Sequence, residues 1–339
     1  GDVKKGIILL KKSLEIDPFN NEIKFNLGQM QIYDKEFTEG WNNFQSRWFY
    51  HNFKSIPFRS SKKKLKSLNE SNCILLWHEQ GIGDQIMYGS MFSEISKISK
   101  KVIVKFDKRL IKIFKGKHRN MYFIDNNTDT KEMQYDAHLP LGDLGYLFRK
   151  DIESFDKVEF PYIDVNEKIC SKVKSTYQSK NKIIVGISWT SKNEEMGLDK
   201  SINLIDLIPI LKLNNLTFLD LEYGESEKEK RNLYKNSGLK IYKFKHIDYF
   251  NDILAVSSII NSCDLIITCS NVNAHIAGAL GKKTLLLLPL GKGRLLNWAS
   301  TNKKSLWYPS VKIFQQRIPG DWTYPIKKLK EEILNLGYK

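Results

Sequence analysis

The sequence predicts an α/β protein with parallel sheets, and three observations support this fold class. Short apolar runs such as Cys73 to Trp77 and Ile183 to Ser188 are bounded by polar residues, as buried strands are. Segments with helical spacing of apolar residues separate these runs, as in βαβ units. The stretch from Asp264 to Pro289 contains the whole unit in order: strand, polar turn, helix and strand.

The polar turn of that stretch, Ser270 to Asn273, indicates a binding site for an anion. It precedes a helix of small residues that has His275 near its start. Backbone N–H groups at a helix N-terminus are unpaired and attract phosphate, and ligands of open α/β sheets bind at the carboxyl ends of strands. His275 is a candidate ligand residue, since a helix N-terminus lowers the pKa of histidine and leaves a neutral donor. The alternative is a histidine with a structural role.

Composition and charge set the limits of the interpretation. The chain has 339 residues, of which 41% are hydrophobic and 12% aromatic, which is typical of a globular protein of two domains. A net charge of +16 favours anionic partners, but the lysines are spread along the chain and also fit a composition bias. Four cysteines without a CxxC pair indicate neither a zinc site nor a disulfide framework. With neither a spanning run nor a signal pattern, we expect a cytoplasmic protein, or one peripheral at the inner membrane.

Three amphipathic helices are predicted first, over Val3 to Ile16, Asn21 to Tyr33 and Phe37 to Trp48. The segment that contains them resembles a tetratricopeptide repeat. One repeat and half of another are too few for a stable solenoid, so we expect either that more repeats precede Gly1 or that these helices pack on the next domain. Residues 53–71, with the basic run Lys62 to Lys66, read as a solvated linker or, alternatively, as a binding element.

The loop HEQGIGD, which follows the strand Cys73 to Trp77, is the candidate catalytic loop. Its glycines Gly81 and Gly83 allow a tight turn and close approach of a ligand. Asp84 at the start of the next helix is either an N-cap or a carboxylate base facing a cleft. Together with Gly81, the neighbouring His78 and Gln85 are candidates for lining that cleft.

The second half of the chain supplies candidate ligand-binding residues at strand ends. The loop after Ser188 offers Thr190, Lys200 and Ser201, and Lys200 could neutralise a diphosphate or be an ordinary exposed lysine. Glu222 and Tyr223 follow another strand, where a ring and backbone groups could hold a flat base. Further predicted elements are the strands Val102 to Phe106, Met121 to Ile124, Tyr135 to Leu139, Leu216 to Leu221 and Lys240 to Phe244, and the helices Gln85 to Ile98, Val165 to Gln178 and Asp252 to Asn261.

Six ordered motifs resemble those of bacterial tetratricopeptide-repeat glycosyltransferases. The transferase half of that family is similar to the lipopolysaccharide heptosyltransferases and more distantly to protein O-GlcNAc transferase. The motifs are the repeat ending in Gly40-Trp41 and Arg47-Trp48, ILLWHEQGIGDQIMYGSMF, VGISWTSKN with Lys200-Ser201, LDLEYGE, DLIITCSNVNAHIAGALGKK and LWYPSVKIFQQRIPGDW.

The resemblance implies a GT-B architecture, with two Rossmann-like domains facing across a cleft. Repeat helices (1–52) and the linker (53–71) would precede an acceptor domain (72–164) and a nucleotide-sugar domain (165–310). We expect the segment 311–339 and its helix to pack back on the N-terminal domain. The family usually has Asp-Thr where this chain has Ser270-Asn271, and Gly-Lys-Gly-Arg at 291–294 replaces a more aromatic stretch.

The same resemblance implies roles for the candidate residues. Asp84 matches the general base, and Lys200 with Ser201 matches the pair near the donor phosphates. The implied activity is inverting transfer of a hexose or heptose from a nucleotide-sugar to a hydroxyl of a protein or glycan, without metal or other cofactor. The remaining donor-site candidates are Gly83, Thr190, Glu222, Tyr223, Ser270, Asn271, Asn273, Ala274 and His275.

Two other classes of function remain open. An inactive transferase-like scaffold or peptide-binding module is favoured by Ser270-Asn271 and opposed by Asp84 and His275. Nucleic-acid binding rests on charge alone, because no recognition-helix or stacking signature accompanies it, and we expect no such partner.

Overall fold

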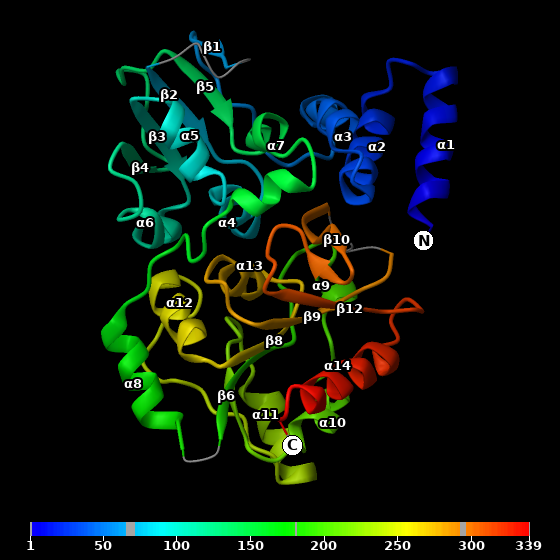
Figure 1. Cartoon of the computed structure of the whole chain (residues 1–339), viewed down its shortest axis with the longest axis vertical. Helices are drawn as coiled ribbons and strands as arrows, with labels where there is room; N and C mark the ends of the chain where they lie inside the picture. The colour runs from blue at the N-terminus through cyan, green and yellow to red at the C-terminus, as the bar shows by residue number, and fades with distance from the viewer. Residues whose placement is uncertain (1, 66–71, 180–181, 292–295, 339) are drawn as a thin grey trace. The chain divides into compact units, whose positions relative to one another are not determined.

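The computed structural model describes residues 2–65, 72–179, 182–291 and 296–338 (Figure 1). The chain divides into two compact units, which are the N-terminal domain (Gly1–Tyr162 with Leu295–Ser300) and the C-terminal domain (Ile163–Arg294 with Thr301–Lys339). The N-terminal domain therefore includes a short segment, Leu295–Ser300, from the second half of the chain. Both domains contain parallel sheets with helical connections, so the predicted α/β class is confirmed.

The N-terminal domain, as far as it is described, contains a five-stranded sheet of order β1-β5-β2-β3-β4 whose neighbouring strands all pair in parallel. Its strands are β1 (Lys63–Lys64), β2 (Cys73–Trp77), β3 (Lys101–Phe106), β4 (Met121–Asp125) and β5 (Ala137–Pro140). Its helices are α1 (Val3–Ile16), α2 (Asn21–Asp34), α3 (Phe37–Phe44), η1 (Gln45–Phe49), α4 (Ile82–Gly89), α5 (Phe92–Ile98), α6 (Lys108–Phe114), α7 (Asp143–Phe148), η2 (Glu153–Lys157) and η4 (Leu296–Trp298).

The C-terminal domain contains, within its described part, a seven-stranded sheet of order β10-β11-β12-β9-β8-β6-β7. Strands β7, β6, β8, β9 and β12 run parallel, and β11 is antiparallel to β12. The strands are β6 (Ile183–Ser188), β7 (Leu216–Asp220), β8 (Leu265–Cys269), β9 (Thr284–Leu288), β10 (Ser300–Thr301), β11 (Lys304–Ser305) and β12 (Val311–Gln315). The helices are α8 (Glu167–Tyr177), α9 (Gly197–Lys200), η3 (Leu204–Leu207), α10 (Ile208–Leu211), α11 (Glu227–Ser237), α12 (Ile253–Ser262), α13 (Val272–Ala279) and α14 (Thr323–Asn335).

The N-terminal helices pack on the N-terminal domain, which is one of the two arrangements expected. Two glycines let α2 and α3 approach closely, because neither position has room for a side chain. A Cβ on Gly28 would lie 2.6 Å from the backbone nitrogen of Phe44, and a Cβ on Gly40 would lie 2.8 Å from the backbone nitrogen of Ile32. The buried Trp41 of α3 donates from its indole nitrogen to the Arg149 carbonyl at 2.8 Å. These helices therefore share a core with the sheet domain.

The C-terminal helix is the main correction to the predicted domain organisation. Helix α14 belongs to the C-terminal domain, not to the N-terminal one as expected. Its apolar face, which includes Ile326, Leu329 and Ile333, is buried in one core cluster with strand residues of β6, β8 and β9. A helix with such a face packs wherever a matching apolar surface lies, and the sequence pattern alone did not show which sheet offered it.

Several predicted elements have different bounds in the structure. The helix expected over Gln85 to Ile98 is two helices, because the backbone N–H groups of Ser90 and Met91 bond three residues back instead of four. The strand expected over Lys240 to Phe244 is reduced to an isolated bridge between Leu219 and Tyr242. Part of the expected linker is strand β1, which pairs with β5, and residues 66–71 of that linker lie outside the described residues.

Candidate functional site

Asp84 is the third residue of helix α4, not its N-cap. The N-cap is Gly81, whose backbone N–H donates to Oδ2 of Asp84 at 3.1 Å. The other carboxylate oxygen, Oδ1, accepts from the side-chain amide of Asn297 at 2.8 Å. The carboxylate is therefore held by donors on both oxygens inside the N-terminal domain, and Asn297 is a residue that the sequence analysis missed.

The other candidates of this loop have different environments. Gln85 is buried, and its side-chain oxygen accepts from the backbone N–H of Asp107 at 3.0 Å, so it ties α4 to the end of β3. His78 is half-buried at the end of β2, and its burial lowers its pKa below the ordinary value of 6.5. Gly83 lies within α4. Gln85 thus has a structural contact where an acceptor-lining role was predicted.

A buried ion cluster contacts the loop that carries Asp84, and the sequence analysis did not find it. Arg47 of η1 donates to both oxygens of Glu79 at 2.9 and 3.1 Å and to Asp143 at 2.6 Å. All three side chains are at most 4% exposed. Lys64 adds a second cation to Asp143 at 2.6 Å. Because Glu79 precedes the loop glycines, the N-terminal helices fix the loop that carries Asp84 through one guanidinium.

In the C-terminal domain, Asn271 joins the ends of two strands. Its side-chain amide donates to Ser188 Oγ at 3.1 Å and to the Thr190 carbonyl at 3.0 Å. Its side-chain oxygen accepts from Thr268 Oγ1 at 3.1 Å and caps α13 by accepting from the Asn273 N–H at 3.0 Å. This arrangement uses both the donor and the acceptor of a carboxamide.

Glu222 has a contact that differs from its predicted role at a nucleotide base. One of its oxygens accepts from the backbone N–H groups of Trp189 at 2.5 Å and Thr190 at 2.8 Å, and the other accepts from the Thr190 hydroxyl. Burial raises its pKa above the ordinary value of 4.5. The carboxylate therefore holds the turn after β6. Its backbone carbonyl accepts from Lys243 Nζ at 2.7 Å.

Tyr223 and Ser201 brace the same polar loop. The Tyr223 hydroxyl accepts from the Lys192 N–H at 3.1 Å, and burial raises its pKa to about 12. The Ser201 hydroxyl donates to the Gly197 carbonyl at 2.7 Å and accepts from the Ser191 N–H at 3.0 Å. The loop between β6 and α9 is thus closed by side chains that the sequence had assigned to ligand binding.

His275 is buried in the first turn of α13. Its Nδ1 forms a hydrogen bond with the Tyr308 hydroxyl at 2.9 Å. Burial first, and then the nearby charge of Lys200, lowers its pKa to about 3. The neutral histidine that we predicted is found, but burial is its main cause. Lys200 itself is only 4% exposed. A buried ammonium therefore lies close enough to the start of α13 for its charge to act on His275.

The amides of α13 are less available than the sequence suggested. The Asn273 N–H bonds the Asn271 side chain, and the Ala274 N–H bonds the Asn271 carbonyl at 3.2 Å. Asn273 donates from its own side chain to the Leu221 carbonyl at 2.9 Å, which links α13 to the end of β7. Ser270 is buried beside them. The predicted donor residues other than Gly83 lie in the C-terminal domain, whereas Gly83 and Asp84 belong to the N-terminal domain.

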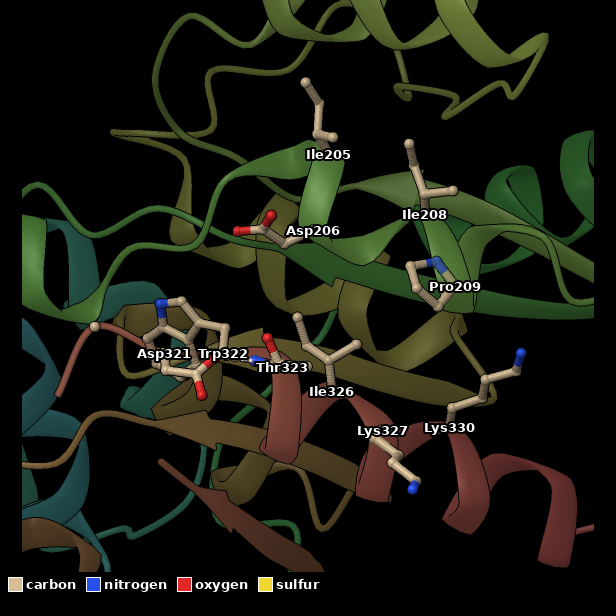
Figure 2. Close-up of a pocket in the computed structure, with 11 residues that line it drawn as sticks. Ile205, Asp206, Ile208, Pro209, Asp321, Trp322, Thr323, Ile326, Lys327 and Lys330 are labelled. Carbon is tan, nitrogen blue, oxygen red and sulfur yellow. Dashed lines mark hydrogen bonds between the residues drawn. The ribbon is translucent and has the colours of Figure 1, made fainter. Parts of the chain in front are cut away.

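A cavity of about 650 Å³ lies elsewhere in the C-terminal domain, and none of the predicted residues lines it (Figure 2). It is formed by η3 and α10 on one side and by the start of α14 on the other, with Trp322 and Ile326 among its apolar walls. Over the described residues, no group of three or more His, Cys, Asp or Glu is placed to hold a metal ion. None of the described helices has the length and apolar character to cross a membrane.

Comparison with known proteins relates the fold to glycosyltransferases. No protein-family model matches the chain. It is 22% identical over 312 residues to the protein FlbA of Caulobacter vibrioides, which is 84% of this chain and 50% of that protein, so the chain spans about half the length of this curated relative. A glycosyl transferase family 9 structure from Veillonella parvula has a TM-score of 0.52 at 10% identity, covering 82% of this chain and 94% of that one. The ADP-heptose lps heptosyltransferase II of E. coli has a TM-score of 0.55 at 12% identity, covering 78% and 98%. The chain therefore has an α/β fold with parallel sheets that resembles those of GT-B glycosyltransferases.

Proposed function

We propose that the protein is a glycosyltransferase that moves a sugar from a nucleotide-sugar donor to a hydroxyl acceptor. The observation that carries the proposal is the buried Lys200, whose charge acts on the neutral His275 at the start of α13. In a doubly wound domain this is where a ligand phosphate binds. The glycosyltransferase-like fold supports the same assignment.

In the proposed reaction, Asp84 takes the proton of the acceptor hydroxyl as that oxygen attacks the anomeric carbon, with inversion. The bond to the nucleoside diphosphate breaks, and the leaving diphosphate gains negative charge. Lys200 and the positive end of α13 stabilise that charge, which is the role a metal ion has in other transferases. We propose that the acceptor is a protein or a glycan and that the N-terminal helices help to bind it.

A second candidate, a binding module without transferase chemistry, is favoured by one observation. Asn271 occupies the amides of Asn273 and Ala274, which we had expected to face the leaving group. With these amides bonded inside the protein, fewer donors remain to hold a diphosphate. Such a protein would keep the fold and bind an acceptor without turning over a donor.

A thermal-shift screen with UDP, GDP, ADP and CMP, with magnesium and with EDTA, tests the donor site. A ligand at about 100 times its dissociation constant stabilises a protein by roughly 2.7 kcal/mol, which is measurable as a shift in Tm. We expect one nucleoside diphosphate to raise the Tm equally in EDTA, and Lys200→Ala to abolish the rise. A rise that depends on magnesium contradicts the metal-free mechanism, and no rise with any nucleotide favours the binding module.

The role of Asp84 is tested separately. Asp84→Asn keeps the shape of the side chain and removes the base, so we expect it to abolish transfer while the nucleotide-induced Tm shift stays the same. The control is Asp151→Asn, since the Asp151 carboxylate accepts from the Ser154 N–H at 2.8 Å in a surface turn of the same domain. Wild-type turnover by Asp84→Asn would exclude Asp84 as the base.

A further inference from the structure

Asn297 reaches Asp84 from a distant part of the sequence. It lies in η4, whose described residues cluster with the N-terminal domain although they follow β9 in the chain. The residue is 4% exposed, and its side-chain amide nitrogen lies 2.8 Å from Asp84 Oδ1. Oδ2 of the same carboxylate accepts from the Gly81 N–H. Donors on both oxygens fix the plane of the carboxyl group as well as its position.

The segment around Asn297 is itself held in place. Helix α2 packs against η4. The Lys35 ammonium donates to the Ser300 carbonyl at 3.3 Å, and Trp298 and Ala299 are fully buried. The residue therefore comes from a packed part of the domain, so its amide is oriented before any substrate binds. Such preorganisation is what a hydrogen bond needs to direct a catalytic group.

We propose that Asn297 is a positioning residue for the Asp84 carboxylate. This inference rests on the proposed function, in which Asp84 is the base. A base must lie within hydrogen-bond reach of the proton that it accepts, and a rotated carboxyl group loses that geometry. Asn297 keeps Oδ1 engaged and holds the plane of the carboxyl group. The amide donates and does not itself touch the reacting atoms.

Thermal stability tests the contact without any assay of activity. Asn297→Asp has the size of asparagine but sets one carboxylate against another, so we expect a lower Tm than for Asn297→Ala. Combining Asn297→Asp with Asp84→Asn restores a donor and an acceptor with their roles exchanged, so the Tm should recover toward that of Asp84→Asn alone. Additive losses in the double variant would overturn the proposed pair.

Measurements of kcat then distinguish a positioning role of Asn297 from a role in packing alone. The assay is release of nucleoside diphosphate from UDP-, GDP- or ADP-glucose with water as the attacking hydroxyl, and the donor nucleotide is chosen by the thermal-shift screen. We expect kcat to fall about tenfold or more in Asn297→Ala and further in Asn297→Asp, with the donor KM nearly unchanged. A residue that only fills space would give the opposite order, because aspartate is isosteric with asparagine. Asn52→Ala is the control, since Asn52 is exposed in the same domain and pairs with Tyr50.

Two failures of this experiment have different meanings. If Asp84→Asn is inactive but both Asn297 variants keep the wild-type kcat, the positioning role is wrong and the proposed function stands. If Asp84→Asn itself turns over at the wild-type rate, Asp84 is not the base and the positioning role of Asn297 falls with it, while the turnover still supports a transferase.

Discussion

The side-chain amide of Asn271 donates to the Thr190 carbonyl at 3.0 Å, although the two residues are 81 positions apart. The same nitrogen donates to Ser188, and the oxygen of the same side chain caps α13. One carboxamide thus connects the end of β6 with the start of α13. The residue at this position therefore affects both the stability of the domain and the shape of the proposed phosphate site.

Asn271→Asp is predicted to destabilise the protein by about 1–3 kcal/mol, because aspartate keeps the cap but cannot donate to Ser188 and Thr190. It places two acceptors, the carboxylate and the Thr190 carbonyl, against each other inside the domain. Urea unfolding of the variant measures the loss. Asn166→Asp is the matched control, because Asn166 also caps a helix through its oxygen, and we expect it to be neutral or slightly stabilising. Equal effects of both variants would contradict the argument.

Glu222→Gln is predicted to be tolerated, and Glu222→Ala to cost about 2–3 kcal/mol. Glutamine can accept from the Trp189 and Thr190 N–H groups with its oxygen and donate to the Thr190 hydroxyl with its nitrogen, while alanine leaves three donors without an acceptor. Circular dichroism with urea unfolding compares the two variants. A Glu222→Gln protein as unstable as Glu222→Ala would show that the negative charge itself is required.

The pH dependence of stability gives a second test at Glu222. Burial raises its pKa in the folded protein above 4.5, so between 4.5 and the raised value the folded state binds a proton that the unfolded state has lost. Stability therefore falls as pH rises through this window. The neutral Glu222→Gln variant should lack this fall, which Tm measurements from about pH 4.5 upward will show. An identical slope in wild type and variant would contradict the direction of the shift.

Arg47→Met is predicted to destabilise the protein strongly, by about 3–5 kcal/mol, because it leaves the Glu79 carboxylate buried without its guanidinium. Adding Glu79→Gln should recover part of the loss, since the neutral amide costs less to bury. Arg109→Met is the control: Arg109 also pairs with a carboxylate, Asp107, but at a more exposed site, so a loss below about 1 kcal/mol is expected. Similar losses of stability in both variants would indicate that burial of the ion cluster does not increase the cost of removing its cation.

How far the sequence could predict this structure depends on the range of the interactions. Buried strands such as Ile183–Ser188 and Leu265–Cys269 follow from local apolar runs, and the polar break before α13 identifies Asn271 and His275. The Asn297–Asp84 pair joins residues 213 positions apart, and Arg47–Asp143 joins residues 96 apart. No local pattern encodes such pairs, because they exist only once the sheets have formed. The sequence could therefore identify the ends of strands, but not which distant side chains form hydrogen bonds or ion pairs with the residues there.

His275 gives a prediction that separates a structural from a ligand-binding histidine. Its pKa in the folded protein is about 3, against an ordinary value of 6.5, so between these values the unfolded state binds a proton that the folded state lacks. Stability therefore rises with pH through this window and is lost as pH falls below 6.5. His275→Gln stays neutral and can still bond the Tyr308 hydroxyl, so its Tm should change less with acid than that of the wild type.

The same variant reports on the donor site at neutral pH, where wild-type His275 carries no charge. If the ring donates to a phosphate or sugar hydroxyl, His275→Gln should weaken the nucleotide-induced Tm shift at a pH where the unliganded variant is as stable as the wild type. The matched variant is Tyr308→Phe, which removes the hydroxyl partner of the ring and retains the ring itself. A shift that survives in His275→Gln and also in Tyr308→Phe would mean that the pair only packs α13 against its neighbours. A shift lost in His275→Gln alone would assign the contact to the histidine ring, because the glutamine keeps the bond to Tyr308 but lacks the geometry of the imidazole.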